Sequence, residues 1–124
     1  MNKHANIPNT YTDAQTLLGD ADERTVDRNT ILLPMPDGSI GLKFHRTVIL
    51  RYNADGTMTV DAGGFRTSTT KERLNQAMPE GFRIYSKGGT WKVDAPNGET
   101  YDFQDGWKII PEAARSFYAF REAL

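Results

Sequence analysis

The sequence predicts an α+β domain that combines an antiparallel β-meander with a short helix after Gly63-Gly64 and an amphipathic helix at the C-terminus. Three observations favour this fold class. Short runs of alternating polar and apolar residues recur along the chain, turn-forming dipeptides such as Asp37-Gly38 and Asn97-Gly98 separate these runs, and two segments carry helix signals. With 124 residues, 38% of them hydrophobic, the chain is long enough for a single core.

The domain is expected to span residues 29–124, and residues 1–28 are expected to form an N-terminal arm. Thr12 is a candidate cap for a short helix over residues 13–18 within this arm. The polar and acidic residues 20–28 are typical of a linker.

The expected strands are short and end at turns. Asn53-Ala54-Asp55-Gly56 predicts a β-hairpin, and a bend or turn is expected at Thr47. No internal repeat is evident. The expected strands cover residues 31–33, 39–51, 57–61, 82–85, 91–93, 101–103 and 107–110. The expected core consists of Leu42, Phe44, Leu50, Met58, Val60, Leu74, Phe82, Ile84, Trp91, Val93 and Phe103.

A helix is predicted where Gly63-Gly64 interrupts the alternation, because paired glycines permit a sharp change in chain direction. Thr69 and Glu72 have the spacing of a capping box, in which each side chain accepts a hydrogen bond from the other residue's amide. The helix is expected to run from about residue 70 to about residue 78, before Pro79.

The C-terminal segment predicts a second helix. Pro111 suits the first helical position, and Ala113, Phe117, Phe120 and Leu124 recur with helical spacing. Because a small sheet cannot fully cover such an aromatic stripe, the sequence favours a homodimer.

Composition limits the choice of function. The chain has 15 basic and 16 acidic residues, but the stretch from Lys43 to Lys92 contains nine cations and four acids. The chain has no cysteine, which excludes disulfides and thiolate chemistry. It has no apolar run long enough to cross a membrane, so no membrane association and a cytosolic location are expected.

The first turn of the predicted helix at Thr70 is a candidate anion site, because its outward amide hydrogens carry partial positive charge. A basic outer sheet face would extend this site if the strands containing His45 and Tyr85 share a sheet. The alternative is that the threonines only cap the helix and the cations are solvated. The candidate ligand-binding residues are Arg66, Thr67, Thr69, Thr70, Lys71, Arg73, Lys43, His45, Arg83, Tyr85 and Lys87, with Lys92 on the same outer face.

No catalytic signature or metal-ligand set is evident in the sequence, and no cofactor is expected. The two histidines, His4 and His45, are too few for a multi-histidine metal site. The segment from Gly64 to Lys71 lacks the Gly-Lys-Ser/Thr order of a phosphate-binding loop. An enzyme would have to use His45, Thr67 and Arg66, the only plausible catalytic constellation.

Several motifs together resemble a family of small proteins encoded by tailed bacteriophages. They are Asn29-Thr30, the Leu-x-Phe-His-x-Thr stretch from Leu42 to Thr47, Asp55-Gly56-Thr57 and, most specifically, Gly-Gly-Phe-Arg-Thr-x-Thr-Thr-Lys-x-Arg-Leu-Asn from Gly63 to Asn75. The resemblance covers about residues 25–110. This chain has Phe65 where the family usually has tryptophan, and Arg46-Thr47-Val48 where the family often has Asn-Thr-Asp. The resemblance implies phage origin and the host cytoplasm as location, and it implies no particular chemistry.

Three functional classes remain open. The first is a non-enzymatic binding protein that engages a phosphate-bearing ligand, a nucleic acid or a nucleotide, through its basic central region. The second is a protein that docks on a host protein, for example as an inhibitor of a host defence system. The third is a small enzyme that uses His45. Binding ranks above catalysis because no catalytic signature accompanies the basic region.

Overall fold

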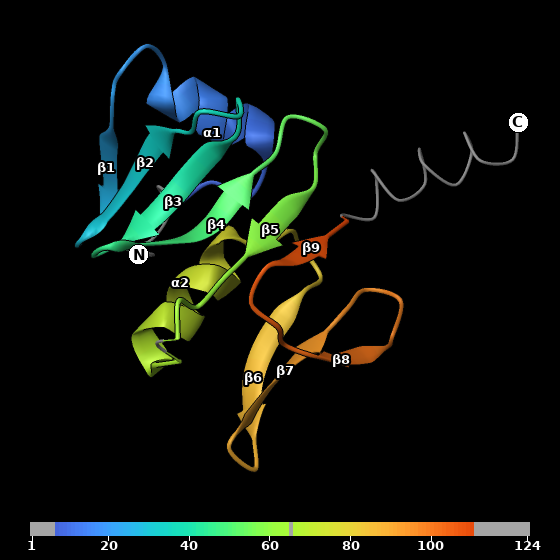
Figure 1. Cartoon of the computed structure of the whole chain (residues 1–124). Coiled ribbons are helices and arrows are strands. Elements are labelled where there is room, and N and C mark those ends of the chain that lie inside the picture. The colour runs from blue at the N-terminus through green and yellow to red at the C-terminus, as the bar shows by residue number, and fades with distance from the viewer. Residues whose placement is uncertain (1–6, 65, 111–124) are drawn as a thin grey trace, which may run out of the picture.

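The computed structural model describes residues 7–64 and 66–110, which form two helices and two antiparallel sheets (Figure 1). The predicted C-terminal helix lies outside the described residues. The helices are α1 (Tyr11–Leu18) and α2 (Ser68–Ala77). The strands are β1 (Arg24–Asp27), β2 (Thr30–Pro34), β3 (Ile40–Phe44), β4 (Thr47–Tyr52), β5 (Met58–Val60), β6 (Arg83–Lys87), β7 (Thr90–Asp94), β8 (Thr100–Asp102) and β9 (Trp107–Ile109).

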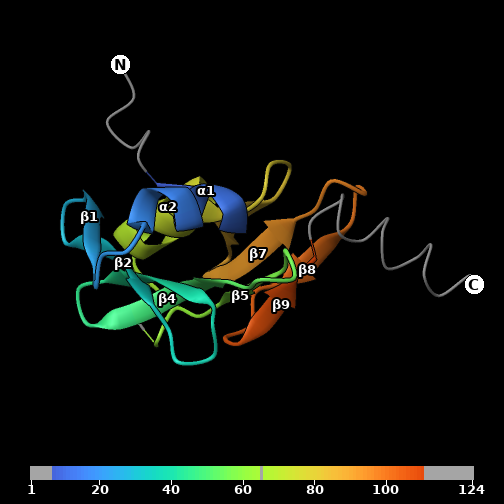
Figure 2. The same cartoon turned by 90° about the horizontal axis from the view of Figure 1, so that it is seen from above.

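The larger sheet has six strands in the order β1-β2-β3-β4-β5-β9, and both helices lie on one of its faces (Figure 2). The smaller sheet has the order β6-β7-β8. The predicted antiparallel strands are therefore confirmed, but they do not form one meander. Strands β3 and β6 lie in different sheets, so the predicted single basic face across them is wrong.

The smaller sheet and α2 are inserted between two neighbouring strands of the larger sheet. Strand β9 pairs with β5, with Met58 opposite Ile109. Two hydrogen bonds join the ends of the insertion: Gly106 N–H donates to the Val60 carbonyl at 2.7 Å, and Ala62 N–H donates to Asp105 Oδ1 at 2.7 Å.

Three hairpins are built on the same five-residue loop, at residues 35–39, 53–57 and 95–99. In each loop the first residue donates its N–H to the carbonyl of the fifth residue, at 2.9 Å, and accepts from the glycine N–H, at 3.0 Å. An Asp or Asn at the third position accepts from the fifth amide, at 2.9 to 3.0 Å. Glycine at the fourth position supplies the positive φ that this turn requires. The same turn geometry therefore recurs three times, each time with Asx-Gly at the third and fourth positions of the loop.

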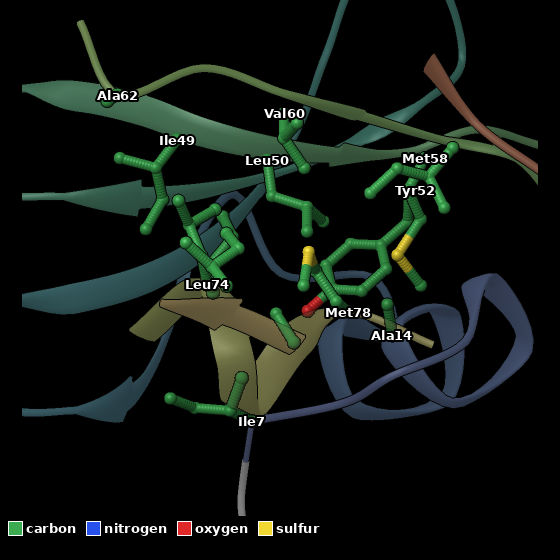
Figure 3. Close-up of a cluster of buried hydrophobic side chains, with 14 of the residues drawn as sticks. Ile7, Ala14, Ile49, Leu50, Tyr52, Met58, Val60, Ala62, Leu74 and Met78 are labelled. Carbon is green, nitrogen blue, oxygen red and sulfur yellow. The ribbon is translucent and has the colours of Figure 1, made fainter. Parts of the chain in front are cut away.

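The core is one cluster that both sheets and both helices share (Figure 3). Leu50, Tyr52 and Val60 of the larger sheet point toward Leu74 and Met78 at α2. Nine of the predicted core residues are buried: Leu42, Leu50, Met58, Val60, Leu74, Ile84, Trp91, Val93 and Phe103. Phe44 and Phe82 are only partly buried and pack against the cluster.

The N-terminal region contributes directly to this core. Helix α1 buries Ala14 and Leu18 and is capped by Thr10, whose hydroxyl accepts from Asp13 N–H, so the predicted cap at Thr12 is wrong. Gly19 ends the helix with a φ of 57°. The predicted linker is also wrong at β1, because this strand pairs with β2 and buries Val26.

Helix α2 follows the glycine break as predicted but is capped two residues earlier than expected. Thr67 has extended backbone angles, and its Oγ1 accepts from Thr70 N–H at 3.2 Å. Glu72 contacts Arg73 in place of the predicted capping-box amide. Several threonines stand close enough together for each to be a candidate N-cap. Thr67, whose backbone is extended, is the one that caps the helix.

Candidate functional site

A cavity of about 700 Å³ lies between the turn that joins β3 to β4 and the start of α2, and we call it the threonine pocket. Its size falls within the usual range for small-molecule sites. It is lined by Phe44, His45, Arg46, Thr47, Ile49, Ala62, Thr67, Thr69 and Thr70. Four of the predicted site residues, His45 and the three threonines, therefore meet in one place.

One wall of the threonine pocket is the tight turn at His45 and Arg46. His45 has a φ of 56°, an uncommon conformation for a residue other than glycine, and its N–H donates to the Asn29 carbonyl at 2.8 Å. The turn interrupts the strand alternation, so His45 lines the same cavity as Phe44 and does not point away from it as predicted. Their rings are 4.4 Å apart and tilted by 57°. Both His45 and Arg46 are exposed.

The opposite wall is the first turn of α2. The Thr67 hydroxyl lies 3.0 Å from the Thr70 hydroxyl, and Lys71 N–H donates to the Thr67 carbonyl at 3.0 Å. The amides of Ser68 and Thr69 belong to the first turn, where a helix supplies no backbone acceptor. Thr69 is exposed and Thr70 is buried. Thr67, Thr69 and Thr70 therefore line the cavity at the end of the helix where the backbone amides carry partial positive charge.

Close packing between strand and loop holds the two walls in place. A Cβ added to Gly63 would lie 2.5 Å from Cγ2 of Thr47, a lining residue. Gly63 N–H also donates to Asp61 Oδ1 at 2.6 Å. The pairing of β3 with β4 shifts by one residue between Leu42 and Lys43, and Ile49 is buried at this shift. Gly63 thus allows the loop to approach β4 closely enough to form the pocket.

Arg73, a predicted ligand contact, is instead part of the core. It is only 6% exposed, and its Nε donates to Thr30 Oγ1 at 3.1 Å. Its guanidinium lies 3.6 Å from an Asp27 carboxylate oxygen and 5.5 Å from the centre of the Phe44 ring. A buried and bonded guanidinium has few donors left for a ligand. Arg73 therefore stabilises β1 and β2 against α2 and holds Phe44.

Arg66 and Lys71 lie toward the smaller sheet. The Arg66 guanidinium stacks 5.8 Å from the Trp91 ring centre and 5.1 Å from that of Phe103. Lys71 donates to Ser86 Oγ at 3.2 Å. Neither residue lines the threonine pocket, although both flank the start of α2.

The remaining predicted residues are placed away from the pocket. Arg83, Tyr85 and Lys87 lie on β6, where the Tyr85 hydroxyl donates to Asp94 and the Arg83 guanidinium packs on the Tyr85 ring. Lys92 of β7 forms an ion pair with Asp102. These carboxylates reduce the positive charge of that face. Lys43 is half-buried between Ile31 and Val48 on neighbouring strands of the larger sheet.

Five lining residues were not among the predicted site residues: Phe44, Arg46, Thr47, Ile49 and Ala62. Arg46 and Thr47 directly follow His45. A two-residue turn predicted at this point would have placed both residues near the first turn of α2. The basic dipeptide His45-Arg46 was the feature of the sequence from which this part of the site could have been predicted. Phe44 was predicted as a core residue, because alternation does not distinguish the bottom of a cavity from a filled core.

Within residues 7–64 and 66–110, no cluster of three or more acidic or histidine side chains is arranged to hold a metal ion. No helix in this part of the chain is long and apolar enough to span a bilayer.

Comparison with known proteins identifies one family. The family model described as Kyanoviridae Gp96 protein matches residues 11–110, which include both helices and all strands described above. No curated protein and no solved structure matches the chain. The match supports the resemblance to a family of small tailed-phage proteins, while the specific motif from Gly63 to Asn75 stays a prediction. The chain belongs to the Kyanoviridae Gp96 protein family.

Proposed function

We propose that this phage protein is a non-enzymatic binding protein that takes a phosphate-bearing ligand into the threonine pocket. The observation that supports this proposal is the meeting of an exposed Arg46 with the hydroxyls and amides of the first turn of α2 across one cavity. Phosphate oxygens accept hydrogen bonds from hydroxyls, helix-terminal amides and guanidinium groups.

The electrostatics of the pocket favour an anion. Among the described residues, no carboxylate lies within ion-pair distance of His45 or Arg46, whereas Arg51, Arg73 and Lys92 are all ion-paired. Within residues 7–64 and 66–110, no Asp or Glu lines the cavity. The positive charge at this site is therefore not balanced locally. In the part of the chain that the structure describes, the Thr67 hydroxyl is bonded to Thr70 and no hydrogen bond joins it to His45, the base that an enzyme would have to use.

Titration of the full chain with inorganic phosphate and pyrophosphate tests this proposal. Binding should be measured by ¹H–¹⁵N chemical shifts at low and moderate salt, because phosphate contacts weaken as salt rises. Shifts should concentrate at Ser68, Thr69 and Arg46. Arg46→Gln should weaken pyrophosphate binding roughly tenfold, the effect of losing one charge-assisted hydrogen bond.

Arg83→Gln is the matched control, because it removes an exposed arginine that does not line the pocket. Thr69→Val removes a hydroxyl without removing the Thr67 cap and should also weaken binding. The absence of any shift at low salt, or equal effects of Arg46→Gln and Arg83→Gln, would refute the proposal. In that case the docking of the protein on a host protein becomes the leading function.

A further inference from the structure

We infer that the ligand of the threonine pocket is a free nucleotide, held with its phosphate at the mouth and its base at the bottom. This inference rests on the proposed function and adds the chemical class of the ligand. It comes from the distribution of polar and apolar residues with depth in the cavity.

The mouth of the pocket is polar and the bottom is apolar. His45, Arg46, Thr67 and Thr69 are exposed. The buried lining residues are Ile49, Ala62 and Thr70, and the Thr70 hydroxyl is already bonded to that of Thr67, so the deepest part of the lining offers a ligand mainly hydrocarbon. A ligand that fills the cavity must therefore combine an anionic end with an apolar or flat end. Inorganic phosphate has no apolar part to fill the bottom of the cavity. A sugar phosphate would bury its hydroxyl groups against side chains that cannot form hydrogen bonds with them.

Phe44 makes a flat aromatic base the best fit for the inner end. Phe44 lines the pocket, and its ring is held by the Arg73 guanidinium at 5.5 Å and by contact with the His45 ring. Arg73 is itself fixed by Thr30 and Asp27. A ring that is already immobilised loses little side-chain entropy when a ligand packs on it. Stacking of a base on an aromatic side chain tolerates any base, because every base has a π face.

The closed bottom favours a free nucleotide over a nucleic acid chain. Ile49 lies on β4 and Ala62 follows β5, two paired strands of the larger sheet, so the base of the cavity is the sheet itself. A polymer could insert only a terminal nucleotide. Arg73 acts as a positioning residue in this arrangement, because it holds Phe44 without touching the ligand.

Isothermal titration with purified full-length protein tests the inference. The probes are adenosine 5′-monophosphate, cytidine 5′-monophosphate, adenosine, ribose 5-phosphate and a short single-stranded DNA with a 5′-phosphate. Both nucleotides should bind at least tenfold more tightly than ribose 5-phosphate and than adenosine. Phe44→Leu should weaken nucleotide binding about tenfold and change ribose 5-phosphate binding less than twofold. Tyr85→Leu, on the smaller sheet, should leave both affinities unchanged.

The outcomes separate this inference from the proposed function. Equal affinity for nucleotides and ribose 5-phosphate refutes the nucleotide and leaves phosphate binding intact. Equal affinity for adenosine and its monophosphate refutes phosphate binding. Tighter binding of the DNA than of the monophosphates refutes the free nucleotide. If Phe44→Leu does not fold, nucleotide-specific shifts of the Phe44, Ile49 and Ala62 amides in the wild type decide the question; their absence counts against a base at the bottom.

Discussion

The side chain of Asn75 makes both hydrogen bonds that a neighbouring strand would make to Ile84. Asn75 Oδ1 accepts from Ile84 N–H at 2.7 Å, and its Nδ2 donates to the Ile84 carbonyl at 2.9 Å. Strand β6 is an edge strand of the smaller sheet, so α2 satisfies backbone groups that would otherwise be unpaired. One side chain thus attaches the smaller sheet to the helix that begins at the threonine pocket.

Asn75→Ala should lower the free energy of unfolding by about 1–3 kcal/mol, because it leaves two partly buried backbone groups without partners. Urea denaturation measures this loss, and hydrogen exchange at the Ile84 amide should accelerate. Asn97→Ala is the control, since Asn97 accepts from Glu99 N–H in an exposed turn. Equal losses in the two variants would contradict the role of Asn75.

Gly63→Ala should be more destabilising than Gly64→Ala. Both glycines have positive φ, at 61° and 81°, so each alanine costs about 1–2 kcal/mol of backbone strain. Only at position 63 would the new Cβ meet another group, Cγ2 of Thr47, which adds roughly 1–3 kcal/mol. Thermal unfolding compares the two variants. A Gly63→Ala protein as stable as Gly64→Ala would show that Thr47 can move aside.

Arg73→Met should destabilise the fold by about 3–5 kcal/mol, the usual cost of breaking a buried ion pair. The variant keeps most of the side-chain volume but loses the contacts to Asp27 and Thr30. Arg83→Met, at an exposed position, should change stability by less than about 0.5 kcal/mol. Chemical denaturation of both variants tests whether Arg73 is structural. Unchanged stability in Arg73→Met would contradict this role.

Because Tyr52 is buried, the free energy of unfolding is expected to fall in alkaline solution. Its hydroxyl is buried and donates to the Pro8 carbonyl, and burial raises the pKa of Tyr52 far above its ordinary value. The folded protein therefore keeps this proton at pH values where the unfolded chain, with an ordinary pKa of about 10, releases it. The stability contributed by neutral Tyr52 is complete below about pH 10 and falls as the pH rises further.

Urea titrations from about pH 8 to about pH 11 measure this effect on both sides of the ordinary tyrosine pKa. Tyr52→Phe should make the alkaline loss of stability shallower, and Tyr101→Phe on the smaller sheet is the matched control. At neutral pH, Tyr52→Phe should also cost about 1–3 kcal/mol, because the Pro8 carbonyl loses its donor. Identical alkaline slopes in the two variants would contradict the prediction.

Local signals in the sequence were sufficient for most elements of the fold. Asp37-Gly38, Asp55-Gly56 and Asn97-Gly98 each form the predicted turn, because an Asx side chain and a positive-φ glycine specify this geometry within a few residues. The division into two sheets could not be predicted in this way. It depends on the pairing of β5 with β9, and alternation does not specify which distant strand a given strand joins.

The candidate site was predictable only in part, because local signals identify residue types but not the direction in which each side chain points. The threonines before α2 and His45 were identified from residue type, and the structure brings them to one cavity. Arg66, Lys71 and Arg73 were chosen because they are close in sequence to the cap, yet their side chains are directed to the aromatic pair of the smaller sheet, to Ser86 and to the core. Proximity along a helix does not determine which face a side chain occupies.

The insertion between β5 and β9 has a consequence for the order of folding. Strands β1 to β5 are joined by short hairpins, so their contacts close small loops at low entropic cost. The pairing of Val60 with Trp107 must instead close a loop that contains α2 and the whole smaller sheet. The first five strands are therefore expected to assemble early in folding and β9 to join last, so that amide protection at Val60, whose backbone groups face β9, should develop later than at Leu42.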